Sequence, residues 1–162
     1  KWNKNAIRFT RFDFIDDYIN EVKFPKKDYL IIDLICGNGG NIGVARTFAK
    51  TLKKSKYKKI IIITNDTTSA SENLVQLLSD DQRVIKIGLN TNGRYRIITS
   101  KGHRFSIEKE FYFGSGEIDD AKINSDLRNI EGIGFYPDIW ADNFDDVLKN
   151  IWNITGDYEI QH

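Results

Sequence analysis

The sequence contains no methionine, only one cysteine and almost no net charge, and each shortage limits what the protein can be. A single cysteine, Cys36, excludes a disulfide within the chain and leaves the redox compartment open. The 24 basic and 23 acidic residues give a formal net charge of +1, which argues against a large nucleic-acid-binding surface. No apolar run approaches the roughly 18 residues of a membrane span, so we expect no membrane insertion in this segment. The 40% hydrophobic content is typical of a globular protein with an apolar core.

The start of the sequence lacks both an initiator methionine and the pattern of a signal peptide. We therefore expect that the 162 residues were cut from a longer protein, in which further domains precede them. The length itself predicts one domain, residues 1–162, with no linker and no internal repeat.

The distribution of apolar residues predicts an α/β fold with a parallel sheet. Continuous apolar runs at 29–34 and 60–63 are typical of strands buried on both faces, and 6–12 and 84–87 are predicted as further strands. Helices are predicted at 15–22, 42–52, 69–78 and 144–151. Strands and helices that alternate at these intervals predict parallel strands joined by right-handed crossover helices.

The pattern changes after residue 94. Segments 95–99 and 104–107 flank the sequence SKGH at 100–103, which predicts a β-hairpin with a glycine-containing turn. Residues 114–134 are polar and show no clear pattern, and Pro137 with Asp138 is predicted to begin a closing strand.

A glycine-rich loop follows the first buried strand, where parallel α/β sheets bind ligands. Its backbone N–H groups can approach an anion closely. The segment DLICGNGG at 33–40 also resembles the first motif of methyltransferases that bind a nucleoside cofactor. However, no acidic residue closes the next strand to hold the ribose, because Asp66 falls in the turn beyond it. A plain strand-to-helix turn is an equal alternative.

The second loop at a strand end contains Ser69 and Glu72, and their spacing is that of a capping box at a helix N-terminus. The same geometry supports a second interpretation. A serine at a strand-to-helix turn exposes its hydroxyl, and the N–H of Ala70 points toward any oxyanion that forms there. The Gly39–Gly40 turn of the neighbouring strand would supply the second donor.

Six sequence blocks in order resemble those of the S41 serine peptidases, the C-terminal processing (tail-specific) proteases and their tricorn-like relatives. The blocks are YLIIDL at 29–34, GG at 39–40, IIIITN at 60–65, TSASE at 68–72, IGLNTNG at 87–93 and IEGIGFYPD at 130–138. The resemblance covers roughly residues 6–150. It implies a crotonase-like (ClpP-like) α/β core and hydrolysis of peptide bonds through an acyl-enzyme on serine, with a polypeptide as substrate and no cofactor or metal.

The resemblance assigns roles to individual residues. Ser69 matches the nucleophile, and the N–H groups of Ala70 and of Gly40 or Gly39 match the oxyanion hole. Glu131 matches the glutamate that supports the catalytic groups in tricorn-like members. Glu72 matches an acidic position present in both branches, although helix capping explains it equally well.

The general base of the family is not evident in this sequence. The processing-protease branch uses a lysine in a Thr-x-Gly-Lys block, and here the block ends in Arg94, which stays protonated. The tricorn-like branch uses an upstream histidine, and the first histidine here is His103, expected on the surface of the hairpin turn; His162 is terminal. Family members carry an Asp-Leu-Arg-Gly-Asn block, in which Ile35 here replaces the arginine and the asparagine is displaced to Asn38.

These observations favour the C-terminal part of an S41-type peptidase core whose base lies in a missing upstream segment. The alternatives are a catalytically inactive peptide-binding homologue and, third, a methyltransferase. Since most relatives act outside the cytoplasm, the resemblance implies an exported protein. Cys36 is interpreted as a small buried thiol, because no histidine partner is evident. The six lysines of 50–59 are interpreted as a solvated helix end and not as a nucleic-acid site.

Overall fold

A five-stranded parallel sheet forms the centre of the protein in the computed structural model, which describes residues 6–8, 24–94, 103–108, 111–115 and 132–160. The strand order is β1-β2-β3-β4-β7, and every neighbouring pair is parallel. The bounds are β1 (Ala6–Arg8), β2 (Tyr29–Asp33), β3 (Lys59–Thr64), β4 (Val84–Gly88) and β7 (Ile139–Trp140). The predicted parallel α/β arrangement is confirmed, and so is the closing strand after Asp138.

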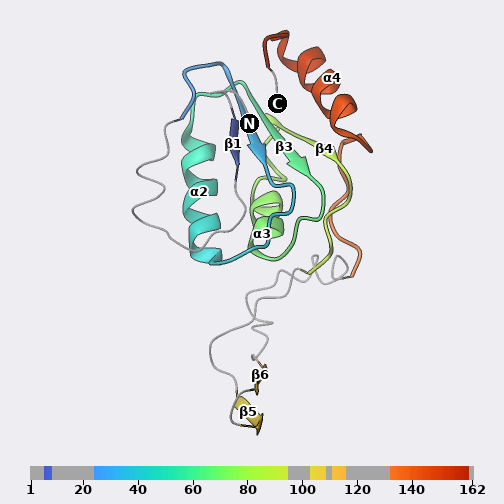
Figure 1. Ribbon diagram of the computed structural model, residues 1–162. Helices are drawn as coiled ribbons and strands as arrows, with labels where there is room; N and C mark the ends of the chain where they lie inside the picture. The colour runs from blue at the N-terminus through green and yellow to red at the C-terminus, as the bar shows by residue number, and fades with distance from the viewer. Residues whose placement is uncertain (1–5, 9–23, 95–102, 109–110, 116–131, 161–162) are drawn as a thin grey trace.

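Helices cover both faces of this sheet (Figure 1). The helices α2 (Ile42–Lys54) and α3 (Ala70–Leu77) pack together on one face, and α4 (Phe144–Thr155) lies on the other. Side chains of a strand alternate between its two faces. In β3, Ile60 and Ile62 therefore pack toward α2 and α3, whereas Ile61 and Ile63 pack toward α4. No helix among the described residues is long and apolar enough to cross a bilayer.

The helix ends are fixed by local hydrogen bonds. The side chain of Asn41 accepts from the N–H of Gly43 at 2.7 Å at the start of α2, and Asn143 accepts from Asp146 at 2.9 Å at the start of α4. Gly156, at φ 69°, ends α4 in the left-handed conformation that glycine adopts without strain. Predicted helices 42–52 and 144–151 are thus confirmed, with C-termini that extend slightly further.

The C-terminal end of α2 is neutralised by the guanidinium of Arg83. Its nitrogens donate to the backbone carbonyls of Leu52, Ser55 and Tyr57 at 3.0, 2.8 and 3.1 Å. Asp81 accepts from the same guanidinium at 2.6 Å, and this contact raises the pKa of Arg83. The partial negative charge of this helix end is therefore already compensated within the fold.

The strand predicted at 104–107 is confirmed, whereas the strand predicted to pair with it, at 95–99, lies outside the described residues. The confirmed strand is the first of an antiparallel pair, β5 (His103–Glu108) with β6 (Phe111–Ser115), which forms a separate sheet. The backbone register pairs Phe105 with Phe113 and contains an irregularity between Ser106 and Glu108. The aromatic run at 111–113 has a strong strand propensity.

Several predictions concern residues outside those that the structure describes. They include the helix at 15–22, the second half of the strand at 6–12, the strand at 95–99 and most of the unassigned segment 114–134.

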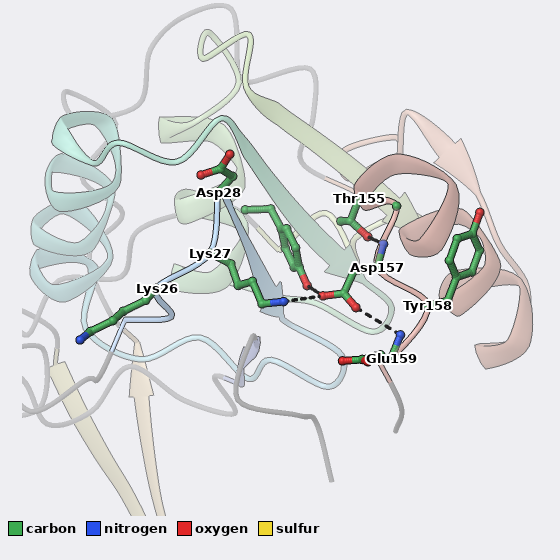
Figure 2. Close-up of a pocket in the computed structure, with 9 residues that line it drawn as sticks. Lys26, Lys27, Asp28, Thr155, Asp157, Tyr158 and Glu159 are labelled. Carbon is green, nitrogen blue, oxygen red and sulfur yellow. Dashed lines mark hydrogen bonds and ion pairs between the residues drawn. The ribbon is translucent and has the colours of Figure 1, made fainter.

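Hydrogen bonds and an ion pair to Asp157 attach the residues after α4 to the sheet. Figure 2 shows the side chain of Lys27 extending toward Asp157. The carboxylate accepts from the Tyr29 hydroxyl at 2.5 Å and from the Lys27 ammonium at 3.0 Å. The hydrogen bond from Tyr29, followed by that from Lys27, lowers the pKa of Asp157.

This contact predicts a pH-dependent contribution to stability. A carboxyl group with a lowered folded-state pKa stabilises the protein above its unfolded pKa of about 3.9, and this contribution is lost as the pH falls through the lower, folded-state pKa. We therefore expect Asp157→Asn to reduce the urea midpoint at pH 7 and to differ little from the wild type near pH 2. An equal difference at both pH values would show that the charge is not what matters.

Candidate active site

The loops after β2 and β3 continue the hydrogen bonding of the sheet beyond the strands themselves. Their backbone contacts are Leu34 N–H to Ile63 O at 3.0 Å, Cys36 N–H to Asn65 O at 2.8 Å and Thr68 N–H to Gly37 O at 2.9 Å. The buried hydroxyl of Thr67 adds a bond to the Leu34 carbonyl at 2.9 Å. The two loops that the sequence analysis selected are therefore held side by side at the C-terminal edge of the sheet.

Ser69 lies at the turn between β3 and α3 in a conformation that is rare for a residue with a side chain. Its φ is 58° and its ψ is −121°. The other two N-cap residues of the described helices, Asn41 and Asn143, have φ values of −82° and −136° and the extended backbone usual at that position. Capping alone therefore does not account for the backbone of Ser69.

Gly39 packs directly against Ser69. A β-carbon placed on Gly39 would lie 2.5 Å from Cβ of Ser69, 2.9 Å from its Oγ and 3.0 Å from the backbone nitrogen of Ala70. Gly39 also has a φ of +83°, so both the space and the backbone conformation require glycine. The structure thus brings the glycine loop and the Ser69 turn together, as the sequence predicted.

The first residue of α3 and the Gly39–Gly40 turn adjoin Ser69. Ala70 is the first residue of α3, where N–H groups have no partner within the helix and the helix dipole is positive. Gly40 is exposed and has a φ of 115°. Ala70 and the Gly39–Gly40 turn therefore occupy the positions from which donors could stabilise a negative charge near Ser69.

The carboxylate of Glu72 holds this turn in place through hydrogen bonds. Its side chain is fully buried; one carboxylate oxygen accepts from the N–H of Ser69 at 2.9 Å and the other from the N–H of Gly93 at 2.7 Å. The capping box that the sequence predicted is therefore present, with the Glu72 carboxylate accepting from the N–H of the cap residue Ser69. With both oxygens occupied by backbone donors, Glu72 positions the turn and is not placed to accept a proton from the serine.

Arg94 reaches the same turn through its backbone. Its carbonyl oxygen accepts from the N–H of Ser69 at 3.1 Å, and the residue is exposed. The position at which the resemblance expects a lysine is therefore next to Ser69 in space, but it carries a guanidinium that cannot act as a base.

Two predicted residues cannot be placed. Glu131 and His162 lie outside the described residues, although Gly132, the neighbour of Glu131, donates to the Gly93 carbonyl at 2.7 Å. His103 is the first residue of β5 and does not lie in the expected turn. Cys36 is exposed at φ 56°, so its interpretation as a small buried thiol is wrong.

Residues 91–93, which the sequence analysis named only as part of family blocks, also contact the loops at this edge of the sheet. Asn92 donates from its backbone to the Thr67 carbonyl at 2.8 Å, and the Thr91 hydroxyl accepts from the N–H of Phe135 at 2.8 Å. The Asn92–Gly93 pair in the loop after a strand was the available signal. No group of three or more potential metal ligands occurs among the residues that the structure describes.

Comparison of the structure with solved structures shows which fold this is. It is similar to a photosystem II D1 C-terminal processing protease, with a TM-score of 0.59 and 18% identity over 94% of this chain and 46% of that protein. It is also similar to a candidate peptidase from Parabacteroides merdae, with a TM-score of 0.61 and 15% identity over 96% of this chain and 63% of that protein. A lipoprotein from Streptococcus agalactiae matches with a TM-score of 0.57 and 15% identity, over 96% of this chain and 69% of that protein.

At these identities the comparisons show the fold, which is that of C-terminal processing proteases. The chain spans about half the length of the D1 processing protease and 63% of the candidate peptidase. No protein-family model and no curated protein sequence matches the chain.

The packing of Gly39 against Ser69 predicts the effect of adding one methyl group. Gly132 has the same φ of +83° but nothing within 4 Å of its added β-carbon, so Gly132→Ala is a matched control for backbone strain. We expect Gly132→Ala to lower the free energy of unfolding by about 1–2 kcal/mol. Gly39→Ala should lower the free energy of unfolding by about 1–3 kcal/mol more than Gly132→Ala does, because the methyl group displaces Ser69. Urea titrations of the two variants provide the test; equal losses would contradict the contact.

The two backbone hydrogen bonds of Glu72 predict a second effect. In Glu72→Gln, the amide NH₂ group faces one of the two N–H donors and leaves it unpaired in a buried position. We expect a loss of about 1–3 kcal/mol in the free energy of unfolding. The Ser69 and Gly93 amide protons should also exchange faster with solvent. Unchanged exchange at both amides would show that the carboxylate does not hold the turn.

Proposed function

We propose that the chain is the C-terminal part of an S41-type serine peptidase core, of crotonase-like type, in which Ser69 attacks the peptide carbonyl and forms an acyl-enzyme. The observation that carries the proposal is the backbone of Ser69, at φ 58° and ψ −121°. The fold of the C-terminal processing proteases supports it independently.

Backbone strain of this kind has an energetic cost. A residue with a side chain in such a region costs on the order of 1–3 kcal/mol and persists where surrounding contacts impose it. Here Glu72, Arg94 and Gly39 impose it. A sharp strand-to-helix turn of this type presents a serine hydroxyl above the sheet, as the nucleophile turn of other serine hydrolases does.

The chemistry follows from the groups around that hydroxyl. As Oγ bonds to the carbonyl carbon, the carbonyl oxygen gains negative charge, which the N–H of Ala70 and that of Gly40 or Gly39 stabilise. Removal of one such donor typically costs about 10²–10³ in kcat. Glu131, adjacent to Gly132 at this site, is the proposed supporting carboxylate.

Removal of the Ser69 hydroxyl proton requires a general base, and neither Arg94 nor Glu72 supplies one. Arg94 cannot be deprotonated, and both oxygens of Glu72 accept backbone hydrogen bonds. We therefore propose that the base comes from a residue outside these 162, in a longer protein of which this chain is one domain. A polypeptide substrate and a location outside the cytoplasm are parts of the same proposal. A catalytically inactive peptide-binding protein is the alternative.

The methyltransferase alternative is less well supported. Its glycine loop would have to accommodate a nucleoside cofactor, whereas Ser69 fills the space against Gly39. The end of β3 also provides Thr64, whose hydroxyl donates to the Leu89 carbonyl at 2.7 Å, where the ribose would need a carboxylate.

The proposal is tested by labelling with a fluorophosphonate and by hydrolysis of an unstructured peptide. Without a base, the chain should react with the probe barely above background. In Arg94→Lys, an amine that can lose its proton replaces the guanidinium at a position whose backbone contacts Ser69. We expect labelling at Ser69 to rise at least roughly tenfold, since a general base contributes about 10²–10⁴.

Two variants control this experiment. Arg46→Lys makes the same exchange on α2, away from Ser69, and should leave the labelling unchanged. Ser69→Ala combined with Arg94→Lys should remove the gain. Labelling that persists without Ser69 would overturn its assignment as nucleophile. No gain in Arg94→Lys, together with tight binding of the peptide, would favour the inactive peptide-binding alternative.

A further inference from the structure

Two hollows lie at the N-terminal edge of the sheet, at the opposite ends of the strands from Ser69. The first has a volume of about 650 Å³ and is lined by residues 26–29 and 155–159. Figure 2 shows that Lys27 extends toward Asp157, whereas Lys26 extends away. Because the Asp157 carboxylate already accepts two hydrogen bonds, this hollow gives no reason to expect a charged ligand.

The second hollow, of about 580 Å³, has an apolar wall. It lies between residues 24–28 and the C-terminal end of α2, and its lining consists of Phe24, Pro25, Lys27, Asp28, Thr51, Lys54, Ser55, Lys56 and Tyr57. The ring of Phe24 stacks on the core residue Phe48 at 6.1 Å. The Tyr57 hydroxyl donates to the Pro25 carbonyl at 2.9 Å, so this ring contributes carbon surface to the wall. Its volume is within the range of small-molecule sites.

The charges around this second hollow are unbalanced. Lys27 is paired with Asp157, and Asp28 is paired with Lys58 at 2.6 Å. Lys54 and Lys56 are exposed and have no carboxylate partner among the residues that the structure describes.

These two lysines are also not needed to compensate the end of α2. That role is filled by the Arg83 guanidinium, which donates to the Leu52, Ser55 and Tyr57 carbonyls. Two ammonium groups beside an apolar wall are therefore left without a function inside the fold.

We propose that this hollow binds a monomeric anionic amphiphile, such as a medium-chain carboxylate. Its apolar chain contacts Phe24 and Tyr57, and its carboxylate lies between Lys54 and Lys56. The site is separate from Ser69 and does not depend on peptidase activity. Apolar burial supplies most of the affinity, and the two lysines supply the preference for an anion.

Titration calorimetry of the whole chain with decanoate, decanol and decyltrimethylammonium tests this proposal. We expect decanoate to bind most tightly and the cation most weakly. Lys54→Gln with Lys56→Gln should weaken decanoate binding roughly 3- to 10-fold and leave decanol unchanged. Lys50→Gln with Lys149→Gln removes the same charge elsewhere and should bind decanoate like the wild type. Circular dichroism verifies that both double variants are folded.

Amide chemical shifts locate the bound ligand. Decanoate should move the resonances of residues 51–57 and leave those of residues 69–72 in place, and Ser69→Ala should bind it normally. Decanoate that binds no tighter than decanol, or equally well after loss of Lys54 and Lys56, would overturn the proposal. Lysine-dependent sedimentation with phosphatidylglycerol vesicles, without binding of monomeric decanoate, would also overturn it, in favour of a membrane surface.

Discussion

The arrangement of the candidate site depends on the buried carboxylate of Glu72. It joins the turn at Ser69, three positions before it, to the loop at Gly93, 21 positions after it, through one hydrogen bond to each oxygen. A fully buried carboxylate is stable only when such donors surround it. One of these donors is the backbone N–H of Ser69, in an energetically unfavourable turn, so the carboxylate and the strained serine each require the other. The strain is therefore an integral part of the packing.

The sheet could be predicted from the sequence because its signals are local. The runs at 29–34 and 60–63 are apolar without interruption, which is typical of strands covered on both faces. Asn41 and Gly156 mark helix ends through chemistry that acts over a few residues. The closing strand after Asp138 was also found, since proline and aspartate commonly precede a new element.

Features that depend on contacts between distant segments could not be predicted. The pairing of β5 with β6 was not predicted, because the aromatic run at 111–113 was not assigned to a strand and only the fold shows what it pairs with. The exposure of Cys36 depends on the N–H of that residue bonding to Asn65, which holds it in a left-handed turn. The capping pattern of Ser69 and Glu72 was visible in the sequence, but its link to Gly93 required the fold. The roles assigned to Ser69 and Glu131 rest on the resemblance and are proposals.

The backbone contacts beyond the strand ends have a consequence for how such a chain can change in evolution. Each loop at the edge that carries Ser69 is bonded to the next, from Gly37 to Thr68, from Ser69 to Arg94 and from Gly93 to Gly132. An inserted residue in any one of them would break its pairing with both neighbours, so their lengths are mutually constrained. At the opposite edge, the surface ion pairs Lys53–Asp80 and Lys58–Asp28 accompany backbone bonds from Lys58 to Asp28 and from Ile60 to Arg83, and none of these contacts involves the loops around Ser69. That edge is where insertions, fusions and new partners can accumulate without disturbing the serine.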